Sequence, residues 1–312
     1  MGKASRTKVD SSRREKIAAQ RAAARRTEQR RRILIASGAV VVVLAIVVAF
    51  VVIKLNSKPA ADNSPNGPTG AALASVVSNV TSVPASTLDT VADGSGSVTA
   101  KPQTISGSAL TANGKPEVLY IGAEYCPYCA AERWAMIVAM SRFGTFSGLA
   151  TTHSASVSGA GNAEPYPNTP TWTFANAKFT SQYLTFSTVE TQTNIPDKTT
   201  GSYTTLQTPT AAQQALINKY DVPPYVPSGA NGSIPFVDFG NKYLIAGASY
   251  NPQVLSGLSW ATIAADLSNP NSAVAKAIDG TANYITAAVC QLTGNQPASA
   301  CTATVKSLES QI

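Results

Sequence analysis

Two cysteines separated by two residues stand between an apolar run and a segment with helical character. They are Cys126 and Cys129, in the stretch AEYCPYCAAERW at 123–134. The run EVLYIGA at 117–123 predicts a buried strand. The segment CAAERWAMIVAMSR at 129–142 predicts a helix that is closed by a glycine. A Cys-x-x-Cys at such a junction constrains the chain to an α/β architecture with both thiols at the start of a helix.

The rest of the chain from residue 71 onward continues to alternate between strands and helices. The periodicity predicts these further elements: a short helix near ALASVVSNV, a hairpin in GSALTANGKPEVLYIG, a second strand LATTHSAS at 149–156, a hairpin or two added strands in TWTFANAKF and QYLTFSTVETQ, a helix at 208–222, a helix capped by Ser259, and a final helix that ends at Gly294. The aromatic residues of the added strands suit either sheet packing or a peptide groove; they are Trp172, Phe174, Tyr183 and Phe186.

A proline interrupts the apolar segment GSIPFVDFGNKYLIAGASY at 232–250. Proline within such a run argues against a central strand. Pro235 is tolerable there if its peptide bond is cis and the strand meets a ligand at that point. The dipeptide at Gly240 and Asn241 then predicts a β-hairpin between FVDF and KYLIAGASY.

The net charge of +7 is confined to the beginning of the chain. Residues 1–32 contain 12 Lys and Arg against 3 Asp and Glu, whereas the remaining 280 residues contain 12 against 14. The body therefore offers no basic face to a polyanion, and we expect no nucleic-acid partner.

An uncharged run of 21 residues, ILIASGAVVVVLAIVVAFVVI at 33–53, follows the basic tail. At 1.5 Å per residue this run spans about 31 Å, which matches a hydrocarbon core of about 30 Å. A cleaved signal peptide has a shorter apolar region and a shorter basic start, so an uncleaved anchor is favoured. The positive-inside rule predicts a single-pass cell-membrane protein whose tail, 1–32, is cytoplasmic. A linker at 54–70 then leads to an extracytoplasmic domain at 71–312, where disulfides are permitted.

The ordered set of strand, Cys-x-x-Cys helix, strand, helix, Ile-Pro, hairpin and closing helix resembles the thioredoxin fold over about 117–268. This resemblance implies a central mixed sheet flanked by helices, with an insertion at about 157–207. The segments GAEYCPYCAAERWAM, SRFGTFSGL, IPFVDFGNKYLIAGASY and AAVCQLTGNQPASAC together resemble a membrane-anchored family known as domain of unknown function 929. The family name implies no activity, so the chemistry must come from the residues.

One position departs from the thioredoxin pattern. Thioredoxin-fold enzymes often place a buried acid six residues before the first cysteine, where it helps to move protons, and here that position is Tyr120. The nearest carboxylate is that of Glu124, and strand alternation puts it on the same face as Tyr120. Glu124 is therefore a candidate for proton transfer, and the alternative is a solvated strand end.

The Cys126–Cys129 motif admits three interpretations. A zinc knuckle lacks suitable further ligands, because ten residues separate the other two cysteines and the chain has one histidine, so no metal is expected. A purely structural disulfide is the second interpretation. The favoured one is a redox dithiol: the helix start lowers the pKa of Cys126, which attacks, and Cys129 resolves the mixed disulfide. In the implied fold, Pro235 lies beside the cysteines and shapes substrate docking together with Ile234.

Cys290 and Cys301 flank QLTGNQPASA, a turn between two helical segments. We expect a structural disulfide that joins these helices, worth roughly 3 kcal/mol in the chain-entropy model. A second redox pair that exchanges with the first is the alternative.

Together these features predict a membrane-anchored thiol–disulfide oxidoreductase with Cys126 and Cys129 as its catalytic residues. Its substrates would be exported proteins with thiols or disulfides, and an unidentified redox partner would reset the dithiol. No organic cofactor is expected, because the chain has no glycine-rich phosphate loop. The alternative is a non-catalytic binding or assembly module with the same fold and inert disulfides.

Overall fold

The computed structural model of the chain describes residues 67–157, 163–197 and 199–312. The predicted tail at 1–32, the predicted span at 33–53 and most of the predicted linker lie outside these residues. Within them, no single helix has the length and apolar character needed to cross a membrane. Helices α2 (Gly70–Thr81) and α3 (Ala85–Val91) meet this test only as a pair, and the pair is bent by 57°.

The strand and the helix that flank the cysteines are β3 (Lys115–Gly122) and α4 (Pro127–Met140). The other strands that the structure describes in residues 67–312 are β1 (Gln103–Thr104), β2 (Thr111–Ala112), β4 (Thr145–Ser147), β5 (Ala150–His153), β6 (Pro170–Thr173), β7 (Lys178–Thr180), β8 (Thr185–Glu190), β9 (Gln192–Pro196), β10 (Tyr203–Thr205), β11 (Phe236–Phe239) and β12 (Tyr243–Ala246). The other helices there are α5 (Ala211–Tyr220), α6 (Trp260–Asp266), α7 (Ala273–Leu292) and α8 (Ala303–Leu308), with short 3₁₀ turns at Pro252–Leu255 and Glu309–Gln311.

The central sheet is mixed. Strand β3 pairs in parallel with β8 and antiparallel with β11, and the order continues through β12 to β1, while the short β2 pairs with the beginning of β3. The parallel partner β8 follows helix α4 in the chain, so β3, α4 and β8 form a strand–helix–strand unit. Strand β3 therefore has paired neighbours on both sides, which explains its run of five buried residues.

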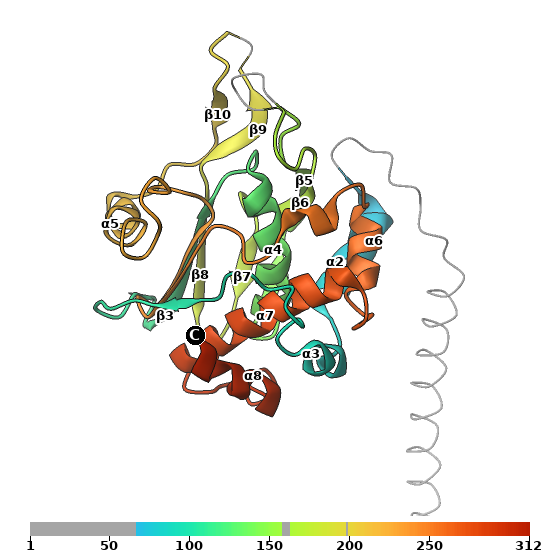
Figure 1. Ribbon diagram of the computed structural model, residues 1–312, viewed down its shortest axis with the longest axis vertical. Coiled ribbons are helices and arrows are strands. Elements are labelled where there is room, and N and C mark those ends of the chain that lie inside the picture. The colour runs from blue at the N-terminus through green and yellow to red at the C-terminus, as the bar shows by residue number, and fades with distance from the viewer. Residues whose placement is uncertain (1–66, 158–162, 198) are drawn as a thin grey trace, which may run out of the picture. The chain divides into compact units, whose positions relative to one another are not determined.

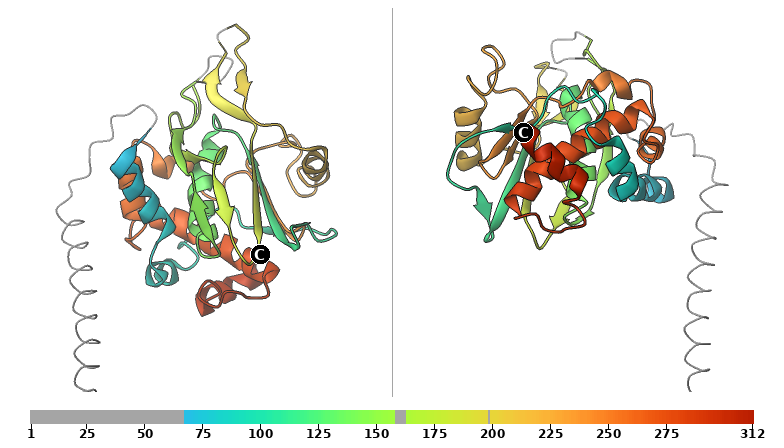
Figure 2. Two further views of the ribbon diagram at one scale, coloured as in Figure 1. Left: turned by 180° about the vertical axis from the view of Figure 1, so that it is seen from behind. Right: turned by 60° about the horizontal axis from the view of Figure 1, so that its bottom comes forward.

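Alternate residues of the central strands belong to two apolar clusters. Val118 and Tyr120 of β3 lie in the larger cluster with α4 and α7, whereas Leu119 and Ile121 lie in the smaller cluster with residues of α5. Figure 1 shows this layering, with α5 on one side of the sheet and α4 and α7 on the other. Helices α2 and α6 pack together beyond α4, as the view from behind in Figure 2 shows. The residues around the cysteines are thus held between a sheet and a layer of helices.

Local turn and cap signals are confirmed. Gly240 has a φ of 66° and Asn241 a φ of 56°, the left-handed backbone required at the two central residues of the tight turn that the Lys242 N–H closes on the Phe239 carbonyl oxygen. Ser259 caps α6 by accepting a hydrogen bond from the Thr262 N–H. Helix α5 begins with a capping box formed by Thr210 and Gln213.

The second strand of the core unit differs from the expectation. The segment at 149–156 does form strand β5, but β5 pairs with β6 in a separate two-stranded sheet. Strand β8, which we had placed within an insertion at 157–207, is the parallel neighbour of β3. The physical reason is burial: β5 is half-buried or exposed along its length, whereas β8 ends in the buried Val189 and Glu190.

Candidate active site

Cys126 is the N-cap residue of helix α4. Its backbone is extended, with φ −75° and ψ 121°, and Pro127 occupies the first helical position, where its missing N–H leaves no bond unmade. The Cys129 backbone N–H donates a hydrogen bond to the Cys126 sulfur at 3.3 Å. Both cysteines are free thiols. The predicted geometry of a dithiol at a helix start is therefore present.

The pKa values of the two thiols are shifted in opposite directions. Burial alone would raise the pKa of Cys126, but hydrogen bonds from Cys129 and the positive charge of Arg133 outweigh it and lower this pKa below its ordinary value. Burial raises the pKa of Cys129 well above its ordinary value, and its hydrogen bond to Cys126 adds to the rise. One thiol is thus adapted to ionise and the other to keep its proton.

Ile234 and Pro235 meet the cysteines from the opposite side. The Ile234–Pro235 peptide bond is cis. The Cys126 thiol lies 3.6 Å from the Ile234 carbonyl oxygen, to which it donates a hydrogen bond. The Pro235 carbonyl oxygen accepts a hydrogen bond from the Gly247 N–H, which ties this segment to the end of β12. The structure therefore brings the two cysteines together with Ile234 and Pro235. The Ile-Pro pair lies 105 residues or more beyond the cysteines in the sequence.

A buried ion pair lies behind the dithiol, and the sequence did not point to it. Arg133 of α4 donates to both carboxylate oxygens of Glu190, from Nε at 2.8 Å and from Nη2 at 2.6 Å. Both side chains are fully buried. Nη2 also donates to the Ala123 carbonyl oxygen at 2.7 Å, which fixes the guanidinium at the end of β3. The sequence shows Arg133 and Glu190 as charged residues in two segments far apart in the chain. It does not show that they pair, because their pairing depends on the register of β8 against β3.

Glu124, the candidate for proton transfer, does not take the position expected from strand alternation. Strand β3 ends at Gly122, so Glu124 lies in the following turn and is half-buried rather than on the face of Tyr120. Its backbone N–H donates to the Gln192 carbonyl oxygen. Tyr120 itself is fully buried, and burial raises the pKa of its hydroxyl well above the ordinary value.

Two pairs of tyrosine rings include the residue before Cys126 and a residue between the cysteines. Tyr125 stacks on Tyr203 with ring centroids 4.3 Å apart, and Tyr128 meets Tyr166 edge to face at 5.9 Å. Tyr128 lies between the two cysteines and is 39% exposed, whereas Cys126 is 5% exposed. Of the two alternatives for Trp172 and Phe174, packing in the core rather than a peptide groove is found, because both side chains are buried in the larger core cluster.

The other two cysteines form the expected disulfide. Cys290, near the end of α7, is bonded to Cys301, which precedes α8, with Cα atoms 5.8 Å apart. Both residues are buried among apolar side chains. The disulfide therefore joins two helical segments.

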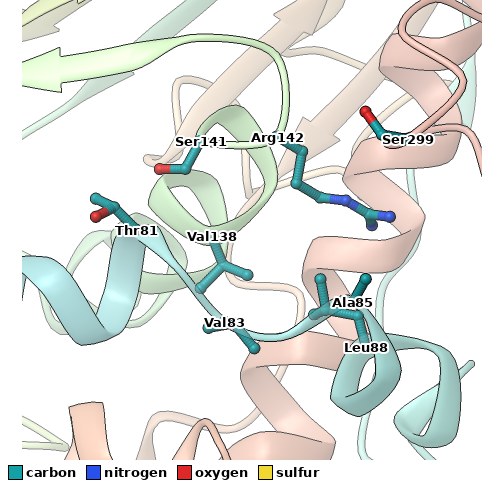
Figure 3. Close-up of a pocket in the computed structure, with 8 residues that line it drawn as sticks. All are labelled: Thr81, Val83, Ala85, Leu88, Val138, Ser141, Arg142 and Ser299. Atoms are coloured by element: carbon teal, nitrogen blue, oxygen red, sulfur yellow. The ribbon is translucent and has the colours of Figure 1, made fainter. Parts of the chain in front are cut away.

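A cavity of about 210 Å³ lies at the end of α4 that is remote from the dithiol. Figure 3 shows the residues that line it: Thr81, Val83, Ala85, Leu88, Val138, Ser141, Arg142 and Ser299. Arg142 donates hydrogen bonds to the Ala300 carbonyl oxygen and to the side-chain oxygens of Asn283 and Thr286. Burial lowers the pKa of this guanidinium to about 10. The cavity thus belongs to the junction between α4 and the disulfide loop.

Comparison with known proteins identifies one family. A family model described as "Domain of unknown function (DUF929)" matches residues 101–291, more than half of the 312 residues. No curated protein and no solved structure matches the chain. The matched segment includes the dithiol, the Arg133–Glu190 ion pair and the Ile-Pro pair. The chain belongs to the DUF929 family.

Proposed function

We propose that this protein is a membrane-anchored thiol–disulfide oxidoreductase that acts on cysteines of exported proteins. The observation that carries the proposal is the position of Cys126. Its sulfur accepts a hydrogen bond at the start of α4 and lies 3.6 Å from the Ile234 carbonyl oxygen that precedes the cis-proline. A thiol in this position has a helix start to stabilise its thiolate and the backbone of the half-buried Ile234 nearby to contact a substrate peptide.

The chemistry follows from the unequal thiols. The Cys126 thiolate attacks a substrate disulfide, forms a mixed disulfide and releases one substrate thiolate. Cys129 then loses its proton and attacks the Cys126 sulfur, which releases the second substrate thiolate and leaves a Cys126–Cys129 disulfide. The reverse sequence transfers the disulfide to a substrate dithiol. Both directions need a partner that resets the dithiol, and neither needs an organic cofactor.

The connectivity supports a thioredoxin-like fold. The unit β3–α4–β8 is followed by α5, the cis-proline, the hairpin β11–β12 and the helix α6. This is the element order on which the resemblance to the thioredoxin fold rests, with β8 in place of the segment at 149–156.

The membrane location is proposed from the sequence. The uncharged run at 33–53 and the basic tail before it favour a single-pass anchor with the dithiol domain outside the cytoplasm. Exported proteins are the substrates that such a domain meets, and that compartment allows disulfides to persist.

A rival function is a binding or assembly module with an inert cysteine pair. The burial of Cys126 favours this rival, since a residue that is 5% exposed needs some local opening of the structure before a protein disulfide can reach its sulfur. Movement of Tyr128, which is 39% exposed, would supply that opening.

The reduction potential of the Cys126–Cys129 pair in the full-length protein separates the two functions. Equilibration in glutathione buffers should give a value between about −120 and −270 mV, the range of catalytic dithiols. In cells, Cys129→Ser should accumulate mixed disulfides with exported proteins, whereas Cys126→Ser should not. A pair that stays oxidised below about −300 mV, together with no mixed disulfides, would favour the binding module.

A further inference from the structure

Two hydrogen-bond donors behind the dithiol have no acceptor. The Tyr120 hydroxyl and Arg133 Nη1 are both buried and have no hydrogen-bond partner among the described residues. Tyr120 and Arg133 each have 0% exposure. Buried donors are almost always paired, because an unpaired one loses its bond to water without replacement. Two such donors in one place indicate that an acceptor arises there in another state of the protein.

Tyr120 and Arg133 both interact electrostatically with Cys129. Arg133 follows Cys129 by four residues, so the two side chains share one face of α4. The Arg133 guanidinium lies 5.8 Å from the centre of the Tyr120 ring. The Tyr120 hydroxyl extends along β3 over Gly122, where a Cβ atom would lie only 2.3 Å from its oxygen. Gly122 thus provides the space that lets the hydroxyl point toward the cysteine end of the strand.

Among the acidic groups around Tyr120, Cys129 interacts with it more strongly than Glu190 or Cys126. The charged and titratable groups that face Tyr120 are the two thiols and Arg133 of α4, and Glu190 of β8. The Glu190 carboxylate already accepts hydrogen bonds from Arg133 and from the Phe174 N–H. Because burial raises the pKa of Tyr120, its hydroxyl keeps its proton and remains a donor.

We propose that the Tyr120 hydroxyl and Arg133 Nη1 donate hydrogen bonds to the Cys129 thiolate when that thiolate forms. Tyr120 is then a catalytic residue of the resolving step. This assignment rests on the proposed function and deepens it, since it names the groups that make the buried thiol able to ionise.

The step can be observed with a small aromatic disulfide, dithiobis(nitrobenzoate), as the oxidant. The Cys126 thiolate attacks one sulfur of the reagent, forms a mixed disulfide and releases one coloured nitrobenzoate thiolate. Cys129 then loses its proton to solvent and attacks the Cys126 sulfur. The Cys126–Cys129 disulfide forms and the second coloured thiolate leaves. The protein loses two electrons and the reagent gains two.

The test is the rate of each release in the full-length protein, measured across pH for the wild type and for Tyr120→Phe. This substitution removes only the hydroxyl. A hydrogen bond to a charged acceptor is worth about tenfold or more in an equilibrium. We therefore expect the second release to slow about tenfold near neutral pH and its pH midpoint to move upward, with the first release unchanged.

Tyr220→Phe is the matched control. Tyr220 is also fully buried, but it lies in the smaller core cluster, and its hydroxyl donates to the Ser106 carbonyl oxygen at 3.0 Å. This variant should lose thermal stability, because it loses a made hydrogen bond, and should keep both release rates. Tyr120→Phe should keep or gain thermal stability, because its hydroxyl is unpaired. A role in packing alone would not slow the second release in Tyr120→Phe while stability is kept, and leave it unchanged in Tyr220→Phe while stability falls.

An unchanged second release and an unchanged pH midpoint in Tyr120→Phe would overturn the proposal. If Tyr120→Phe does not fold, difluorotyrosine at position 120 provides the second measurement. It is a stronger donor of nearly the same shape, so the second release should accelerate, and no acceleration would also overturn the proposal. These stoichiometric rates do not require a physiological substrate. The release rates therefore test the role of Tyr120 in Cys129 ionisation, and the mixed disulfides in cells test the activity on exported proteins. Either result can fail while the other holds.

Discussion

The two ends of helix α4 each lie near a cysteine pair and an arginine, but their surroundings differ in kind: Arg133 is buried, whereas Arg142 is half-buried. At the N-terminal end, Cys126 and Cys129 are free thiols beside Arg133, which is paired with Glu190. At the C-terminal end, Arg142 contacts the loop of the Cys290–Cys301 disulfide through the Ala300 carbonyl oxygen. The 14 residues of α4 separate these regions by about 21 Å.

This difference teaches that the environment, rather than the residue type, decides what a cysteine pair does. The N-terminal pair has backbone N–H groups, a cation and unpaired donors around it, all of which favour a thiolate. The C-terminal pair lies among apolar side chains, which disfavour a thiolate. Direct exchange between the two pairs would require one of them to cross the length of α4. We therefore interpret the first pair as the reactive one and the second as a structural link.

The largest expected effect comes from breaking the ion pair at the dithiol end. Arg133→Met leaves the Glu190 carboxylate buried without its partner, and such a loss costs about 3–5 kcal/mol of unfolding free energy. Urea unfolding of the full-length protein measures it.

Arg142→Met is the control at the opposite end of the same helix. Arg142 bonds only to neutral oxygens, so its removal leaves no buried charge and should cost about 1 kcal/mol. Equal losses for the two variants would show that the ion pair is no more important for stability than the Arg142 contacts.

The second effect concerns the covalent link. The double substitution of Cys290 and Cys301 by alanine opens a loop with a sequence separation of 11, which the chain-entropy model values at about 3 kcal/mol. The same substitution of Cys126 and Cys129 opens no comparable loop and should cost clearly less. Urea midpoints of the two double variants, each against the wild type, make the comparison. A greater loss for the Cys126 and Cys129 variant would mean that the dithiol has the structural role.

Local signals in the sequence were sufficient for the elements next to the dithiol. Strand β3, helix α4 and the β11–β12 hairpin depend on short apolar runs, caps and turn dipeptides, and all three form as predicted. The cysteine pairing at 290 and 301 also follows from spacing within one loop. These features were predictable because each is decided by residues close together in the chain.

Long-range pairing accounts for what was missed. The parallel partner of β3 was assigned to the segment at 149–156, because that segment follows α4 directly, whereas the partner is β8. Once β8 is misplaced, Glu190 cannot be brought to Arg133, and the ion pair stays hidden. Helix α3 is only 7 residues long and begins without a side-chain cap, so it gave no clear start signal. Periodicity within one segment cannot determine which distant segment will cover it.

The smallest effect contrasts Glu132 with its neighbour Arg133 at the dithiol end of α4. Glu132 is fully buried and accepts hydrogen bonds from the Ser249 N–H at 2.8 Å and from its hydroxyl at 3.1 Å. It has no cationic partner among the described residues. Burial therefore raises its pKa from 4.5 to about 7, although the Ser249 hydrogen bonds oppose the rise.

A carboxyl group with a higher pKa in the folded chain keeps its proton while the unfolded chain ionises. The stability from Glu132 is therefore fully present below about pH 4.5 and is lost as the pH rises toward 7. Between pH 5 and pH 7 this loss amounts to about 2 kcal/mol. Asp279, Asp221 and Asp238 also have raised pKa values, so the wild type should show a steeper decline than Glu132 alone produces. In Glu132→Gln, the unfolding free energy should fall by about 2 kcal/mol less between pH 5 and pH 7 than it does in the wild type. Urea unfolding at the two pH values measures this difference. An identical decline in the variant would mean that Glu132 is ionised in the folded protein, and that both buried carboxylates of the dithiol end are charged.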